Sequence, residues 1–191
     1  INAYNFMDGI DGITGGYSLI ILGALAYINA EMVTFVEPAL IYTVLCSVVV
    51  FCFFNFRRKA KCFAGDVGSV SIAFILLFLI GKLILKTEDF SWIILLAVYG
   101  VDSVLTIIHR LMLHENIGLP HRKHMYQLMA NELKIPHVVV SLAYMAVQAI
   151  VIIGYIYCQN WGYLYLLCAI LLLSFIYIWF MRKYFSLHLS V

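Results

Sequence analysis

Six long apolar runs dominate the sequence, and they restrict the chain to a membrane-embedded fold. Each run has the length, ~17–25 residues, that a helix needs to cross the hydrocarbon core of a bilayer. A spanning segment must pair its own backbone polar groups, and these runs lack the period-2 alternation of barrel strands. We therefore expect an all-α, polytopic membrane helical bundle with six transmembrane helices, at residues 16–32, 38–56, 70–86, 91–109, 137–157 and 161–181.

The composition supports a lipid environment and excludes several classes of protein. Hydrophobic residues make up 64% of the 191 residues and charged residues 12%, whereas a soluble domain has ~45–50% and ~25%. This composition excludes a disordered chain, a nucleic-acid-binding domain and a disulfide-stapled secreted module. The 5 cysteines show no metal-ligand spacing. We expect a single membrane domain over residues 1–191, with membrane lipids and no nucleic acid as partners.

Basic residues are concentrated in the loops on one side of the predicted bundle. An even number of spans places residues 1–15, 57–69, 110–136 and 182–191 on the same side. By the positive-inside rule this side is predicted to be cytoplasmic, because the opposite loops are short and mostly acidic. Of the 12 Lys and Arg residues, ten lie on this side: Arg57, Arg58, Lys59, Lys61, Arg110, Arg122, Lys123, Lys134, Arg182 and Lys183.

The segment before the first span carries Asn and Asp at intervals of three. The set is Asn2, Asn5, Asp8 and Asp11. In a helical turn this spacing places the four side chains along one edge. Gly9 and Gly12 would let the backbone approach a ligand closely. The alternative is a hydrated, capped approach to the first helix, where Asn and Asp are common.

The second cytoplasmic segment has one carboxylate, Asp66, between Gly65 and Gly68. Four cations precede it: Arg57, Arg58, Lys59 and Lys61. A hard oxygen ligand beside basic residues suits Mg²⁺ bound together with phosphate, because Mg²⁺ uses one or two carboxylates with phosphate oxygens and water. The alternative is that the basic residues only anchor the loop to anionic lipid headgroups.

The third segment combines an intramembrane carboxylate with a basic loop. Asp102 lies within the fourth span, where burying a carboxylate costs ~2.5–3.5 kcal/mol on insertion scales. Arg110 follows two helical turns later, so a structural contact between these two residues, direct or relayed, is the main alternative to a site. The loop then reads Pro120-His121-Arg122-Lys123-His124-Met125-Tyr126-Gln127, a compact candidate for anion binding.

In this order, the three segments resemble the polyprenyl-phosphate N-acetylhexosamine-1-phosphate transferase superfamily, glycosyltransferase family 4, which includes WecA-like and MraY-like enzymes. The resemblance covers residues 2–130. It rests on four motifs: Asn2-x-x-Asn5-x-x-Asp8-Gly-x-Asp11-Gly, Phe54-Asn55 followed by Phe63-x-Gly65-Asp66-x-Gly68-Ser69, Asp102 with Arg110, and Arg122-x-His124-x-x-Gln127.

The resemblance implies transfer of sugar 1-phosphate from a UDP-N-acetylhexosamine donor to undecaprenyl or another polyprenyl phosphate. The products are UMP and the lipid-linked sugar, in the initiating step of cell-envelope glycan synthesis. It also implies Mg²⁺ as cofactor, with Mn²⁺ as an alternative, and a bacterial inner-membrane location with a cytoplasmic active site. The oligomeric state stays open, with a homodimer as one alternative. The family has an aspartate pair in an earlier loop that is not in this chain. We therefore expect the chain to be the C-terminal portion of a longer transferase.

The site residues carry over from the family by position. Asp66 is the expected metal ligand. Asn5, Asp8 and Asp11 would line the nucleotide and metal pocket, and Phe63 would lie against the uracil. Tyr126 and Gln127 replace two histidines of WecA-like members, which leaves the sugar open. The expected catalytic residues are Asp66, Asp8, Asp11 and His124, and the expected substrate-binding residues are Asn2, Asn5, Asn55, Phe63, Arg122, Gln127, Asp102 and Arg110.

Three other classes fit less well. An intramembrane aspartyl protease that used Asp66 and Asp102 would need Gly at the position of Phe63. A membrane zinc protease would need His where Gly118 follows the His114-Glu115 pair. A membrane transporter without enzymatic activity is the best alternative, and it predicts polar groups or helix breaks near the middle of the membrane.

Overall fold

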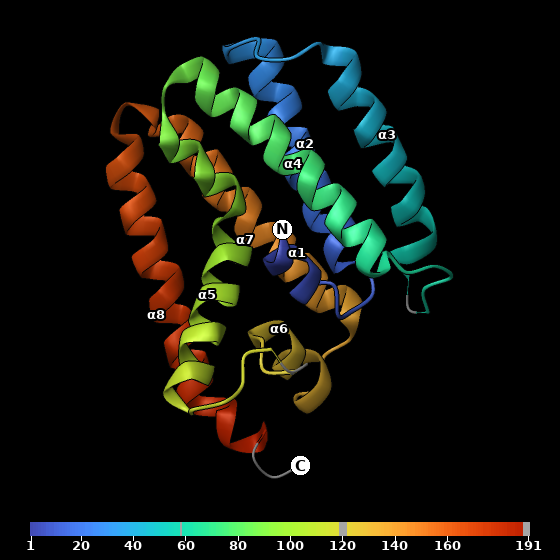
Figure 1. Ribbon diagram of the computed structural model, residues 1–191, viewed down its shortest axis with the longest axis vertical. Helices are drawn as coiled ribbons and strands as arrows, with labels where there is room; N and C mark the ends of the chain where they lie inside the picture. The colour runs from blue at the N-terminus through green and yellow to red at the C-terminus, as the bar shows by residue number, and fades with distance from the viewer. Residues whose placement is uncertain (58, 119–121, 189–191) are drawn as a thin grey trace.

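The computed structural model shows a bundle of long helices that run between two ends of the molecule (Figure 1). It describes residues 1–57, 59–118 and 122–188, among which there is no strand. The predicted all-α bundle with six long apolar helices is confirmed. The long elements are α2 (Ile13–Tyr27) with the π-helical turn η1 (Ile28–Met32), α3 (Pro38–Asn55), α4 (Gly65–Thr87), the 3-10 segment η2 (Phe90–Leu96) with α5 (Ala97–Met112), α7 (His137–Tyr157), and η4 (Gln159–Trp161) with α8 (Gly162–His188).

Two short helices lie among the long ones. The helix α1 (Asn2–Phe6) is packed against α4 and α5 (Figure 1). The helix α6 (Met125–Gln127) continues into a π-helical turn, η3 (Leu128–Glu132), near the end of the bundle where α5 ends and α7 begins (Figure 1). Both short helices carry predicted site residues.

Helix α4 begins at Gly65, before the apolar run predicted to start at residue 70. Hydropathy detects only the part of a helix that lies in the apolar run, whereas the hydrogen-bonded turns continue beyond it. The first turns of α4 therefore contain Asp66 and Ser69, and this end of the helix forms part of the candidate site.

The fourth span is not a uniform helix, because its first seven residues form the 3-10 segment η2. Gln148 of α7, which is fully buried, supplies partners for backbone groups at this irregularity. Its Nε2 donates to the carbonyl of Ile94 at 3.0 Å, and its Oε1 accepts from the N–H of Val98 at 3.1 Å. A non-helical stretch within a bilayer is tolerated when neighbouring side chains satisfy its backbone in this way.

Aromatic side chains dock α1 into the bundle. The hydroxyl groups of Tyr4 and Ser18 are 2.7 Å apart, and the ring of Tyr4 lies 5.0 Å from the ring of Tyr99. Tyr99 in turn stacks on Tyr17 with a centroid distance of 3.6 Å. The first motif is thus held against α2 and α5 by buried contacts.

We predict that Cys62 and Cys158 react with a membrane-impermeant thiol reagent from opposite sides of the membrane. Cys62 lies between α3 and α4, at the end where α7 begins, and Cys158 follows the other end of α7. The measurement is labelling in intact cells and in inverted vesicles, with the remaining cysteines replaced by Ala. By the distribution of basic residues, Cys62 should label from the cytoplasmic side. Labelling of both from the same side would contradict this topology.

We also predict that Gln148→Leu lowers the free energy of unfolding by about 1–2 kcal/mol, because it leaves buried backbone groups without partners. Thermal unfolding in detergent measures this change. The matched control is Gln159→Leu in η4, after the end of α7, which should stay within about 0.5 kcal/mol. Equal losses in the two variants would show that Gln148 does not support the 3-10 segment.

Candidate active site

The first and second motifs meet through a partly buried hydrogen bond. Ser69 Oγ, in the first turns of α4, donates to Asn5 Oδ1 of α1 at 2.7 Å. Ser69 is fully buried. These residues are far apart in the sequence, and their contact brings the Asn and Asp residues of the first motif to the beginning of α4.

Asp8 and Asp66 form an acidic pair where these segments meet. Thr14 Oγ1 donates to Asp8 Oδ1 at 2.6 Å. Burial raises the pKa of Asp8 above its ordinary value, hydrogen bonds from Thr14 and the Gly65 backbone oppose this, and the nearby charge of Asp66 raises it further. Asp66 itself is exposed. Two carboxylates that repel each other at a surface would be stabilised by a cation between them.

The space beside both glycines of the first motif is occupied by aromatic side chains, whereas the sequence suggested close approach of a ligand. A Cβ at Gly9 would lie 2.2 Å from the hydroxyl oxygen of Tyr126. A Cβ at Gly12 would lie 2.4 Å from the ring of Phe56, and Gly12 has a φ of 86°, which favours glycine. These glycines allow the motif to pack tightly against α6 and the end of α3.

Asn55 has a structural role in addition to any contact with a nucleotide. It is buried, and its Oδ1 accepts from the N–H of Gly12 at 2.9 Å. Its Nδ2 donates to the carbonyl of Cys62 at 2.9 Å. The side chain therefore links the beginning of α2 to the loop between α3 and α4.

Asp102 is 2% exposed and accepts hydrogen bonds from several elements. Tyr144 of α7 donates its hydroxyl to Asp102 Oδ2 at 2.6 Å. Thr106 Oγ1 and the N–H of Met125 each donate to Asp102 Oδ1 at 3.2 Å. Asp102, a predicted substrate-binding residue, is thus buried where α5, α6 and α7 meet, and its hydrogen bonds connect these three helices.

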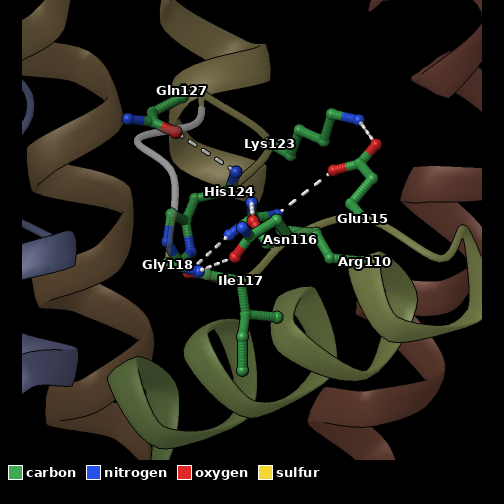
Figure 2. Close-up of polar contacts among 8 residues, drawn as sticks. All are labelled: Arg110, Glu115, Asn116, Ile117, Gly118, Lys123, His124 and Gln127. Atoms are coloured by element: carbon green, nitrogen blue, oxygen red, sulfur yellow. Dashed lines mark hydrogen bonds and ion pairs between the residues drawn. The ribbon is translucent and has the colours of Figure 1, made fainter.

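His124 is buried beside this junction. Its Nδ1 lies 3.2 Å from Asp102 Oδ1, which favours a proton on Nδ1. The rings of Phe6 and Tyr126 stack on its imidazole at centroid distances of 6.3 and 5.8 Å. The His124 N–H donates to Gln127 Oε1 at 3.2 Å (Figure 2). The third and fourth motifs therefore meet in the structure.

Arg110 and Lys123 both bind Glu115 (Figure 2). Glu115 is not one of the site residues that were predicted from the sequence. Arg110 Nε lies 3.2 Å from Glu115 Oε2, and its NH2 donates to the Asn116 carbonyl at 2.6 Å. Hydrogen bonding to Lys123 lowers the pKa of Glu115, and Arg110 lowers it further. The described contacts of Arg110 thus fix residues 115–117. The hydrogen bonds described for Asp102 come from Thr106, Met125 and Tyr144, and none of these three is the suggested contact with Arg110.

Three predicted binding residues lie at the surface. Phe63 is 75% exposed, and Asn2 and Arg122 are exposed as well. This exposure makes them accessible to a ligand, and their roles stay predictions. Arg58 and His121, which belong to the predicted basic segments, lie outside the described residues.

His137, at the beginning of α7, is a further polar residue at the site that the motifs do not include. Its Nδ1 lies 3.3 Å from Asp11 Oδ2, and Ser141 Oγ donates to the Asp11 carbonyl at 3.0 Å. The sequence did carry a signal for such contacts, since polar residues recur along one face of this apolar span.

The acidic pair suits a metal that is shared with a substrate. Within residues 1–57, 59–118 and 122–188, no group of three or more His, Cys, Asp or Glu side chains converges as a metal site. A protein-only cage, as for structural zinc, is therefore not formed by these residues. Mg²⁺ bound with a diphosphate needs only one or two carboxylates, and Asp8 with Asp66 meets this requirement.

Comparisons with known proteins agree with the motifs. Glycosyl transferase family 4 matches residues 1–84. A probable undecaprenyl-phosphate N-acetylglucosaminyl 1-phosphate transferase of Bacillus subtilis is 32% identical over 130 residues, 65% of this chain and 36% of the relative. The phospho-N-acetylmuramoyl-pentapeptide-transferase of Lactobacillus acidophilus is 37% identical over 71 residues, 37% of this chain and 22% of the relative.

An undecaprenyl-phosphate alpha-N-acetylglucosaminyl 1-phosphate transferase of Yersinia pestis is 26% identical over 137 residues, 67% of this chain and 37% of the relative. The matched segments thus cover about a third or less of these relatives. No solved structure matches the chain. The motifs, the six membrane-type helices and these matches confirm the predicted resemblance to the polyprenyl-phosphate N-acetylhexosamine-1-phosphate transferase superfamily, and residues 1–84 match glycosyl transferase family 4.

Proposed function

We propose that the protein transfers sugar 1-phosphate from a UDP-N-acetylhexosamine to undecaprenyl phosphate and releases UMP. The main support is the meeting of the first two motifs, where the Ser69–Asn5 hydrogen bond lies beside the acidic pair of Asp8 and Asp66. The names of the relatives support the acceptor and the type of reaction. We further propose that the site faces the cytoplasm of a bacterial inner membrane, where nucleotide sugars are available.

In the proposed reaction, an oxygen of the acceptor phosphate attacks the phosphorus that carries the sugar. The bond from this phosphorus to the oxygen of UMP breaks, and UMP leaves with that oxygen. Phosphoryl transfer depends mainly on positioning and neutralisation of charge. Asp66 and Asp8 are the side chains that would hold Mg²⁺, whose charge, when bound, offsets that of the diphosphate. Arg122 would add a cation from the segment leading to His124.

The transporter alternative predicted polar groups or helix breaks near the middle of the membrane, whereas the 3-10 segment η2 lies at one end of the fourth span. The backbone groups of Ile94 in η2 and of Val98 in α5 bind the fully buried Gln148 and are not left for a transported substrate. The polar groups of the four motifs gather at the end of the bundle near α6, which favours an enzyme site at the membrane surface.

The experiment that tests the proposed function uses the complete protein with a panel of UDP-sugars and undecaprenyl phosphate. Release of UMP with formation of the lipid-linked sugar supports the proposal and identifies the donor. If UMP release does not depend on the lipid, or no donor in the panel reacts, the proposed transfer is wrong.

We predict that Asp66→Asn reduces turnover by at least about 100-fold while the protein still inserts into membranes. Asp66 is exposed, so its replacement removes a metal ligand without disturbing buried packing. The assay is UMP release over a range of Mg²⁺ concentrations. The control is Glu88→Gln, an exposed acidic residue at the other end of α4, which should keep normal turnover. Near-normal activity of Asp66→Asn at ordinary Mg²⁺ would show that Asp66 is not the metal ligand.

We predict that Arg122→Ala raises the KM for the donor more than Lys123→Ala does. Arg122 is exposed, whereas Lys123 is bound to Glu115. Steady-state kinetics at two salt concentrations measures the difference. Equal effects that fade with added salt would instead indicate a diffuse electrostatic attraction, since a screening length below ~10 Å weakens surface charges.

A further inference from the structure

Helix α7 carries a row of polar residues on one face, although the motifs assign it no role. His137, Ser141, Tyr144 and Gln148 follow one another at intervals of four, three and four, which places them on the same side of a helix. Ser141 and Gln148 are fully buried, and Tyr144 is 3% exposed. In an apolar span, buried polar side chains are expensive unless each one has a partner. The partners of these residues therefore indicate what the face does.

The first turns of α7 hold Asp11 of the first motif. His137 Nδ1 lies 3.3 Å from Asp11 Oδ2 and 3.4 Å from the Asp11 N–H nitrogen. A protonated Nδ1 selects the carboxylate contact, and an unprotonated Nδ1 selects the N–H contact. Ser141 Oγ donates to the Asp11 carbonyl at 3.0 Å in either case. Both the backbone and the side chain of Asp11 are thus bound by one helix.

The next turn of the same face holds the basic segment. Tyr144 donates its hydroxyl to Asp102 Oδ2 at 2.6 Å. The other oxygen of this carboxylate binds His124 Nδ1 and the N–H of Met125, each at 3.2 Å. Asp102 therefore connects Tyr144 of α7 to the segment that contains the last motif.

We propose that α7 is a positioning helix, whose residues His137, Ser141 and Tyr144 set the distance between Asp11 and the His124 segment. The proposal rests on the proposed function, and on the resemblance, which implies that Asp11 lines the nucleotide and metal pocket and that His124 is a catalytic residue. The three side chains are positioning residues, because they act through Asp11 and Asp102. A rigid helix that is hydrogen-bonded to both parts fixes the distance between them. Small displacements of groups in a site can cost about 100-fold in rate.

The test compares two tyrosines of α7 in the complete protein. Tyr144→Phe removes the bond to Asp102, whereas the matched control Tyr155→Phe removes a bond to Asp89 at the other end of the helix. Hydrogen–deuterium exchange of residues 122–130 should increase in Tyr144→Phe and stay unchanged in Tyr155→Phe. UMP release should fall by about 10–100-fold in kcat for Tyr144→Phe only, with a smaller change in the donor KM.

The other half of the face is tested by His137→Ala and His137→Asn. The alanine variant should increase exchange in residues 9–14 and lower kcat by about tenfold or more. Asparagine places an amide nitrogen near the position of Nδ1, so His137→Asn should restore most of both properties. Rescue by Asn distinguishes a specific contact with Asp11 from a general need for a large side chain.

Each outcome decides the proposal. Unchanged exchange in residues 9–14 and 122–130 overturns it, whatever the turnover. Increased exchange with normal kcat in an active protein also overturns it, because the contacts would then be structural only. A wild-type protein that releases no UMP with any donor refutes the proposed function, while the exchange measurements still show whether α7 holds both segments.

Discussion

A polar group inside an apolar bundle must find its partner within the protein, and this requirement organises the structure around Asp102. Its carboxylate is almost fully buried and accepts bonds from Thr106, Met125 and Tyr144. Leaving such a charge unpaired would cost several kcal/mol. These bonds link the helices α5, α6 and α7, and the beginning of α7 lies where it binds Asp11.

The same requirement explains the irregular parts of the bundle. The 3-10 segment η2 persists because Gln148 binds backbone groups on both sides of its junction with α5. The loop after α5 is ordered by Glu115, whose charge is matched by Arg110 and Lys123. At η2 the Gln148 side chain binds backbone groups, and after α5 the Arg110 side chain donates to the carbonyls of Asn116 and Ile117. The backbone can therefore depart from helical geometry in both places.

Much of the fold could be predicted from the sequence, because hydropathy reflects a property of each segment alone. The run predicted at residues 137–157 coincides with α7, and the other helices differ at their ends. The start of α4 at Gly65 was missed because its first turn is polar. The candidate site could be predicted as a set of residues but not as an arrangement. Glu115 and His137 were missed since each depends on a partner that only the fold supplies, and Asn55 looks the same in sequence whether it binds a nucleotide or, as here, Gly12 and Cys62.

The contact between Asp11 and His137 joins residues separated by 126 positions, which has a consequence for synthesis. Translation at ~5–20 residues per second places about 6–25 s between the emergence of these two residues from the ribosome. Throughout this interval Asp11 lacks the helix that holds it, although α2 can already have entered the bilayer. The segment that contains Asp11 is thus made well before the helix that holds it, and any ligand that needs a fixed Asp11 can bind only after the insertion machinery has delivered α7.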